Sequence, residues 1–250
     1  MSQSSVPKEA PQSSAPSTLS KVTTVTMGPY EKGMQKSMTE SNTIPHLYLH
    51  EELDITEVEK MRKALKESNK KVTVMGILIK TFSLALKQFP KMNSTYNPEI
   101  NPFEYSINPS HNISVAIDSP NGLVVPHIKN VNNISLLDIQ SELERLRNLA
   151  KDAKLTAKEL QGGTICLSNI GTIGGTHACP LIMPPQICIV AIGKLQSVPK
   201  YRGGELVERK VLNVSFGCDH RVIDGATVAR FSNCWKQLME NPYLSIAEMI

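Results

Sequence analysis

The stretch of sequence that decides the fold is Val211-Leu-Asn-Val-Ser-Phe-Gly-Cys-Asp-His-Arg-Val-Ile-Asp-Gly225. It begins with apolar residues, and we predict a strand over residues 207–216. Apolar residues then recur at helical spacing, which predicts a helix over residues 224–241. His220 lies in the polar turn between the two elements, where rigid structure on both sides commonly holds a catalytic group.

Strand-like and helix-like segments alternate outward from this stretch, which is typical of an α/β domain. Thr56 and Glu59 form a predicted capping box at the start of one helix. A turn is predicted at Arg202-Gly203-Gly204. We predict further strands over residues 46–54, 112–118, 122–127, 164–168 and 187–193, and helices over residues 31–42, 73–89 and 135–152.

Two sites carry possible chemistry. His220 has a side chain that exchanges a proton near neutral pH, and Asp224 follows four residues later. The simpler alternative for His220 is a solvated Asp-His-Arg turn. Ser168 and Asn169 end another predicted strand before a glycine-rich loop, where hydroxyl and amide groups could bind a developing oxyanion. An ordinary polar loop is the alternative there.

Composition excludes several classes of protein. The 250 residues carry 27 Lys and Arg against 23 Asp and Glu, an excess too small to indicate a nucleic-acid partner. No apolar stretch reaches the roughly 18 residues that a membrane span needs. The five cysteines show no C-x-x-C pair, so we expect neither a disulfide framework nor a metal site. Residues 1–25 are rich in Ser, Pro and Ala, which predicts a flexible linker.

Asp219-His-Arg-Val-Ile-Asp-Gly225 resembles the catalytic signature of the dihydrolipoamide acyltransferases, the E2 components of the 2-oxoacid dehydrogenase complexes. The resemblance extends over about residues 28–250, and features from Arg230 to Pro242 are similar to the branched-chain member. Further matching segments, in the family's order, are Ile44-Pro-His46, His111-Asn-Ile113, Gly122-Leu-Val-Val-Pro126, Gly162-Gly-Thr164, Leu167-Ser-Asn-Ile-Gly171 and Pro184-Pro185.

The resemblance implies a fold and a domain organisation. We expect a chloramphenicol-acetyltransferase-like two-layer α/β sandwich, with a mixed central sheet flanked by helices, that builds a trimer. Residues 26–250 would be the inner-core catalytic domain, and residues 1–25 the last linker. The lipoyl and subunit-binding domains would lie upstream, outside this chain.

The resemblance also implies a reaction and its residues. A branched-chain acyl group would pass from dihydrolipoamide to coenzyme A without a metal. His220 would be the general base, Ser168 would stabilise the oxyanion, and Asp224 would order the loop and the imidazole. Arg62, Asn169 and Gly171 are the candidates for binding coenzyme A. Many family members carry an arginine in the first helix, where this chain has Gly33–Met38, so no charge partner for Asp224 is expected there.

The implied partners follow from the same family. His220 and Ser168 would meet across a subunit interface of a homotrimer, and trimers would assemble into an octahedral 24-mer. The E1 decarboxylase and E3 dihydrolipoamide dehydrogenase would bind an upstream domain, with no nucleic acid or membrane involved. In a eukaryote the location would be the mitochondrial matrix.

Two alternatives stay open. The chain could belong to the E2 of the pyruvate or 2-oxoglutarate complex, which acts on acetyl or succinyl groups. It could also be a catalytically silent scaffold subunit of the same fold. A chloramphenicol-type acetyltransferase is disfavoured by the linker and by the helix at the C-terminus.

Overall fold

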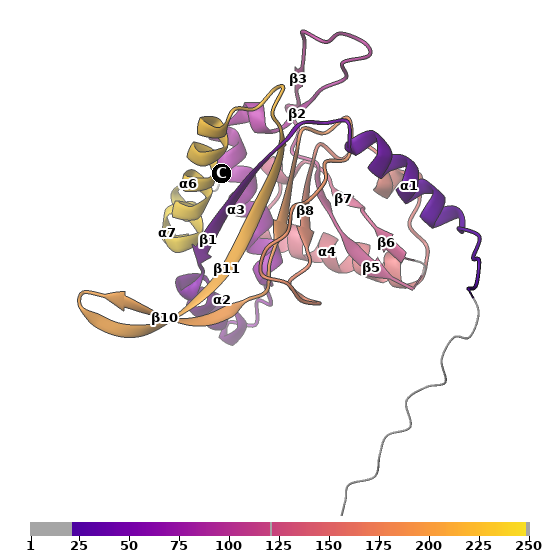
Figure 1. Cartoon of the computed structure of the whole chain (residues 1–250). Helices are drawn as coiled ribbons and strands as arrows, with labels where there is room; N and C mark the ends of the chain where they lie inside the picture. The colour runs from indigo at the N-terminus through magenta and orange to yellow at the C-terminus, as the bar shows by residue number, and fades with distance from the viewer. Residues whose placement is uncertain (1–21, 121, 249–250) are drawn as a thin grey trace, which may run out of the picture.

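The structure is a computed structural model that describes residues 22–120 and 122–248 (Figure 1). Most of the predicted linker, residues 1–25, lies outside the described residues. Residues 22–28 have no regular secondary structure.

A mixed sheet forms the centre of the domain. Its strand order is β1-β11-β9-β8-β4-β7, and β10 pairs with the free half of β11. β8 runs parallel to β4 and to β9, whereas the other pairs are antiparallel. The strands of this sheet are β1 His46–Asp54, β4 Ile113–Val115, β7 His127–Ile128, β8 Ile165–Asn169, β9 Cys188–Ile192, β10 Gln196–Arg202 and β11 Glu205–Asp219. Two small hairpins are separate from it: β2 Ser94–Thr95 with β3 Ser106–Ile107, and β5 Ile117–Ser119 with β6 Gly122–Val124.

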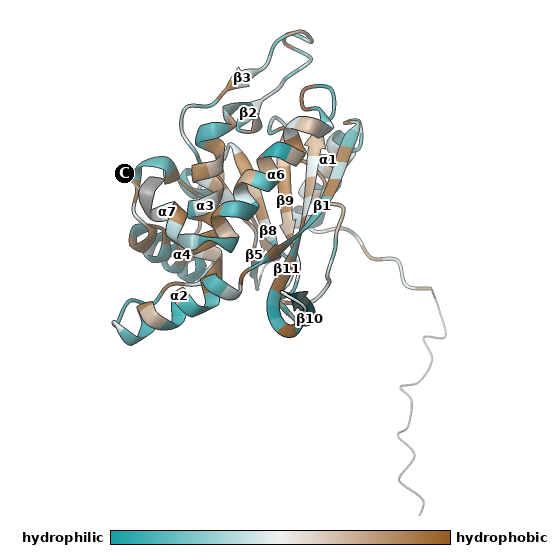
Figure 2. Cartoon of the chain, turned by 90° about the vertical axis from the view of Figure 1, so that its left-hand side faces the viewer, coloured by the Kyte–Doolittle hydropathy of each residue, from teal (hydrophilic) through white to brown (hydrophobic). Residues whose placement is uncertain are grey.

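One face of the sheet is covered by helices, as Figure 2 shows from the helix side. The helices of this layer are α2 Thr56–Glu67, α3 Val74–Gln88, α4 Leu136–Lys151, α6 Gly225–Glu240 and α7 Pro242–Glu248. The short α5 Ala157–Leu160 leads into β8. α1 Pro29–Ser41 lies away from this layer, and only Ser41 at its end is buried (Figure 1). The expected two-layer α/β sandwich is therefore confirmed.

The core lies between this layer and the sheet. α3 is buried over twelve consecutive residues, as its nearly uniform apolar sequence predicts. Its Phe82 packs edge-to-face on Phe231 and Trp235 of α6, with ring centroids 5.1 and 4.9 Å apart. The Trp235 indole nitrogen donates to Thr81 Oγ1 at 3.0 Å, so the polar atom of this buried ring has a partner. These contacts fix α6, and with it the turn that contains His220.

The predicted capping box of α2 was wrong. The helix begins at Thr56, so Ile55 is its N-cap. The Thr56 hydroxyl donates to Asp54 Oδ1 at 2.7 Å and accepts from the Lys210 N–H at 2.9 Å instead of from the helix. Glu59 instead accepts two hydrogen bonds from Arg62. The residue types fit a capping box, but Asp54, two residues earlier, and the backbone N–H of the distant Lys210 bind the threonine hydroxyl.

Three predicted strands differ in their bounds. The strands expected over 112–118 and 122–127 are each divided, because the chain leaves the main sheet after Val115 and returns at His127. Pro126 lies at the second break, where a proline cannot donate to the ladder. β11 is longer than predicted, and its partner β10 was missed because Pro199 interrupts it. Proline is tolerated there since β10 is an edge strand.

Among the helices of residues 22–120 and 122–248, none is long and apolar enough to cross a membrane.

Candidate active site

His220 immediately follows β11, where the sheet passes into α6. The backbone N–H of His220 donates to the Pro45 carbonyl at 3.0 Å, and that of Asp219 donates to the Ile187 carbonyl at 2.9 Å. The turn is thus tied to the chain before β1 and to the chain before β9. The sequence predicts an exposed histidine on a rigid frame, and the structure shows this arrangement.

The protonation of the imidazole follows from one hydrogen bond. His220 Nδ1 lies 3.0 Å from the Ile223 carbonyl oxygen. Because a carbonyl oxygen only accepts, Nδ1 carries the hydrogen in the neutral ring and Nε2 carries the lone pair. Nε2 makes no hydrogen bond to the described residues, and the side chain is exposed. The ring therefore presents a basic nitrogen to whatever occupies the space beside it.

Asp224 is the N-cap of α6. Its Oδ1 accepts from the Thr227 N–H at 2.9 Å, and its Oδ2 accepts from the Thr227 hydroxyl at 2.7 Å. These hydrogen bonds hold the pKa of Asp224 below its ordinary value, so the carboxylate is ionised at neutral pH. The carboxylate orders the start of the helix. The imidazole takes its orientation from the Ile223 carbonyl, a backbone partner that no sequence pattern indicated.

Ser168 lies near the end of β8 and is half-buried. Its neighbour Leu167 points into the core on the helix side, so Ser168 points to the other face of the sheet. Its hydroxyl makes no hydrogen bond to the described residues. The serine is therefore available to donate a hydrogen bond to a group on that face.

Within one chain, Ser168 and His220 lie far apart. Ser168 pairs with Ala191 of β9, and Ala191 pairs with Ser215 of β11. His220 lies five residues beyond Ser215 along the same strand direction. With about 3.3 Å per residue and about 4.8 Å between strands, the separation is roughly 15–20 Å. The two side chains of one protomer therefore cannot act on the same atom.

The candidates for coenzyme A binding lie at two places. Asn169 and Gly171 adjoin Ser168, but the Gly171 N–H already donates to the Ile192 carbonyl at 3.0 Å. A Cβ atom on Gly171 would lie 2.2 Å from the Gly193 carbonyl oxygen, so the glycine is needed for this close approach.

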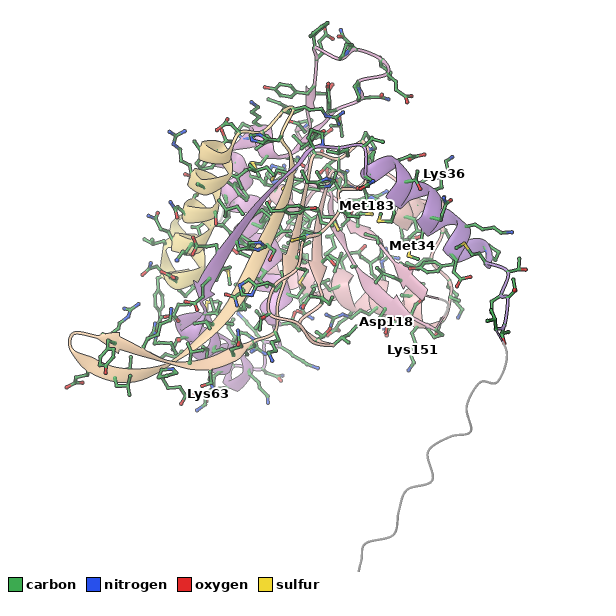
Figure 3. All side chains as sticks on the ribbon, in the orientation of Figure 1. Met34, Lys36, Lys63, Asp118, Lys151 and Met183 are labelled. Atoms are coloured by element: carbon green, nitrogen blue, oxygen red, sulfur yellow. The ribbon has the colours of Figure 1, made fainter. Side chains whose placement is uncertain are left out.

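Arg62 lines an open hollow of about 600 Å³ on the helix side. Glu59 and the Val72 carbonyl hold the guanidinium in place. Lys63, which also lines the hollow, lies at the lower end of the molecule in the view of Figure 3. Five lysines line the same hollow: Lys60, Lys63, Lys66, Lys71 and Lys210. The hollow is therefore strongly cationic, which suits a phosphate-bearing ligand.

Three other histidines are hydrogen-bonded within the fold or buried in it, and we assign them no part in the chemistry. His46 Nδ1 donates to the Ile44 carbonyl at 2.9 Å, and its Nε2 accepts from the Ile182 N–H at 3.0 Å. Burial lowers the pKa of His111 to about 4, and its Nδ1 lies 2.7 Å from the Ser83 hydroxyl oxygen. His127 is buried as well. In residues 22–120 and 122–248 no cluster of three His, Cys, Asp or Glu side chains could hold a metal ion.

Comparison with known proteins places the chain in a family. The family model described as 2-oxoacid dehydrogenases acyltransferase (catalytic domain) matches residues 20–247. The lipoamide acyltransferase component of the mitochondrial branched-chain α-keto acid dehydrogenase complex of Bos taurus is 41% identical over 225 residues. That match covers 88% of this chain and 46% of the bovine protein, so the chain spans about half the length of its curated relatives.

Solved structures give the same result. The dihydrolipoamide acetyltransferase of Azotobacter vinelandii, studied for the catalytic roles of a serine, a histidine and an asparagine, has a TM-score of 0.84. It is 31% identical, and the match covers 92% of this chain and 95% of that one. The cubic core of a pyruvate dehydrogenase complex has a TM-score of 0.85 at 31% identity, over 98% of this chain and 100% of that one.

Chloramphenicol acetyltransferase shares the fold, with a TM-score of 0.54 at 14% identity over 82% of this chain and 94% of that one. The expected fold type is therefore confirmed. With the family model matching almost the whole domain and the signature turn formed as expected, the chain belongs to the family of 2-oxoacid dehydrogenase acyltransferase catalytic domains.

Proposed function

We propose that this domain transfers an acyl group from dihydrolipoamide to coenzyme A. The observation that carries the proposal is the exposed side chain of His220, whose Nδ1 is bound to the Ile223 carbonyl while Nε2 has no partner among the described residues. A thiol is only a few per cent ionised at neutral pH, so a positioned base accelerates its attack on a thioester. General base assistance of this kind is worth about 10²–10⁴ in rate.

The reaction follows in three steps. His220 Nε2 takes the proton of the coenzyme A thiol, and the thiolate attacks the thioester carbonyl of acyl-dihydrolipoamide. The Ser168 hydroxyl donates a hydrogen bond to the oxyanion of the tetrahedral intermediate, which is worth roughly 3–4 kcal/mol. The intermediate then expels the lipoyl sulfur, which takes the proton back from His220. The products are acyl-coenzyme A and dihydrolipoamide.

The Azotobacter relative supports this assignment. Its catalytic histidine follows the serine by 52 residues, and the asparagine follows the histidine by four. Ser168, His220 and Asp224 have the same spacing in this chain. The third position is an aspartate here, and its carboxylate accepts from Thr227 at both oxygens. We assign Asp224 to ordering the turn and the start of α6.

The active site is completed by a second protomer. Because Ser168 and His220 of one chain lie roughly 15–20 Å apart, the pair must come from neighbouring subunits. A homotrimer supplies three such interfaces. The similar cubic core favours further assembly of the trimers into an octahedral 24-mer.

Coenzyme A is the phosphate-bearing substrate in this proposal. The hollow that contains Arg62 and Lys63 suits its phosphate groups. Lys210 of this hollow precedes His220 by ten residues, roughly 33 Å along β11, so the hollow that serves a given His220 must belong to a neighbouring protomer. Asn169 and Gly171 border Ser168 and shape the space for the thioester. No step of the reaction needs a metal ion.

The full-length protein would carry the lipoyl group on an upstream domain and bind the E1 decarboxylase and the E3 dihydrolipoamide dehydrogenase there. The bovine relative favours a branched-chain acyl group and the mitochondrial matrix. Relatives from pyruvate dehydrogenase complexes are 36–38% identical, which makes acetyl transfer the second candidate.

An acyl transfer assay separates the candidates. Isobutyryl-, acetyl- and succinyl-dihydrolipoamide are each supplied with coenzyme A, and the acyl-coenzyme A formed is measured. We expect the isobutyryl donor to give the highest kcat/KM, and His220→Ala to lower it by orders of magnitude. A higher value for the acetyl donor would reassign the substrate. If the protein assembles but turns over none of the three donors, the proposed reaction is refuted, and a catalytically silent scaffold subunit is the remaining function.

A further inference from the structure

The turn that contains His220 includes an ion pair that the proposed reaction does not use. Asp219 is 1% exposed, at the end of β11. Arg221 binds both of its carboxylate oxygens, Nε to Oδ1 at 2.9 Å and Nη2 to Oδ2 at 2.7 Å. The Arg221 backbone N–H also donates to Oδ1 at 3.0 Å. A buried carboxylate needs such partners, and two parallel hydrogen bonds also fix its orientation.

The ion pair connects to the imidazole through the backbone of the turn. The Asp219 carbonyl accepts from the N–H groups of Val222 at 3.0 Å and Ile223 at 2.9 Å. The Ile223 carbonyl is in turn the acceptor of His220 Nδ1. Asp219 closes this turn twice: its carbonyl oxygen accepts from Val222 and Ile223, and its carboxylate accepts from Arg221. The position of the Ile223 carbonyl therefore depends on Asp219.

A third residue holds the guanidinium from the outside. The Arg221 guanidinium carbon lies 5.0 Å from the centroid of the Tyr96 ring. Tyr96 follows β2, in the segment that rises from the end of the molecule where β11 meets α6 (Figure 1). The Tyr96 backbone N–H donates to the Pro185 carbonyl at 2.9 Å, which holds the backbone that carries the ring in place. An arginine between a carboxylate and an aromatic face loses most of its freedom.

We propose that Arg221 is a positioning residue for His220, and that Tyr96 seats its guanidinium. The inference rests on the proposed function. Arg221 clamps Asp219, the closed turn keeps the Ile223 carbonyl in place, and that carbonyl keeps the hydrogen of the neutral imidazole on Nδ1. Without the clamp, the ring is free to adopt the other tautomer, in which Nε2 cannot take the thiol proton.

The first test measures kcat and KM for Arg221→Ala. We expect kcat to fall about 10- to 100-fold, as small displacements of a catalytic group do, with both KM values little changed. Arg221→Lys should stay impaired, because an ammonium group cannot bind both oxygens while it covers the ring. Arg145→Ala is the matched control. It removes a similar two-point ion pair with Glu142 on α4, together with two longer contacts to Glu159, and should leave kcat unchanged.

Chemical rescue separates positioning from a folding defect. Guanidinium chloride, well below denaturing concentrations, should restore most of the activity of Arg221→Ala and none of that of His220→Ala. Tyr96→Phe keeps the ring face and should keep kcat, whereas Tyr96→Ala should lower it. An Arg221→Ala variant with wild-type kcat, or Tyr96→Ala and Tyr96→Phe behaving alike, would overturn the inference and leave the proposed function standing.

Hydrogen exchange provides a measurement that does not depend on activity. In the assembled protein, Arg221→Ala should speed amide exchange in the peptide that contains Val222 and Ile223, and Arg145→Ala should not. Unchanged exchange there would refute the clamp even if the wild-type protein showed no acyl transfer.

Discussion

The separation of Ser168 and His220 in one chain predicts that two inactive variants will rescue each other. His220→Ala removes the base, and we expect a loss of about 10²–10⁴ in kcat. Ser168→Ala removes the oxyanion donor, and we expect a loss of about 10²–10³. Neither side chain is part of the hydrophobic core, so both variants should fold and assemble.

The size of the rescue follows from the symmetry of a ring. Each site takes His220 from one protomer and Ser168 from the next. In a 1:1 random mixture of the two variants, half of the protomers keep the histidine and half of their neighbours keep the serine. About one quarter of the sites are then intact in a cyclic trimer. A site built within one chain would give none.

The two variants carry the same tag, are expressed together and are purified through it, so that the random mixture of trimers is kept. Mixed trimers are verified by native mass spectrometry before acyl-coenzyme A formation is measured. A second mixture, wild type with the double variant, is the control, because it gives about one quarter of the activity for a shared site and about one half for a site within one chain. Mixed trimers whose activity stays at the level of the single variants would refute the shared site.

Three further outcomes are expected. Phe231→Ala should cost about 3–5 kcal/mol of stability, measured by urea unfolding with the fluorescence of Trp235, the single tryptophan and fully buried. Equal midpoints for variant and wild type would contradict the aromatic core. Gly171→Ala should lower activity, because its Cβ would lie 2.2 Å from a backbone oxygen, whereas Gly174→Ala meets nothing within 4 Å and should be silent. Burial lowers the pKa of His111 to about 4, so the unfolded chain binds the additional proton as the pH falls below about 6.5. The contribution of His111 to stability is therefore complete above that pH and lost toward pH 4, by about 2–3 kcal/mol. The thermal midpoint of His111→Asn should depend less on pH over this range than that of the wild type; parallel curves would exclude His111 as the cause.

Local patterns in the sequence account for much of the fold. The α6 stripe of Val228, Phe231, Trp235 and Leu238 is buried as its spacing predicts, and Asp224 caps the helix. β1 has its predicted bounds. The predictions of the stripe and of β1 succeeded because periodicity depends on neighbours a few residues apart. The errors at Thr56, Pro126 and β10 all arose where a more distant partner, or a change of sheet, decided the outcome.

The position of His220 in an exposed turn could be predicted from residues 211–225 alone, because a strand, a charged turn and the start of a helix follow one another there. The tautomer of His220 could not be predicted from the sequence, since it depends on the direction of the Ile223 carbonyl. Nor does any pattern relate Tyr96 to Arg221, which are 125 residues apart in the chain and in contact in space. The side chains to which we assign the chemistry were all proposed from sequence patterns and from the family resemblance. Whether two of them can meet depends on strand register, which joins residues far apart in the chain and places Ser168 and His220 of one protomer at opposite ends of one sheet.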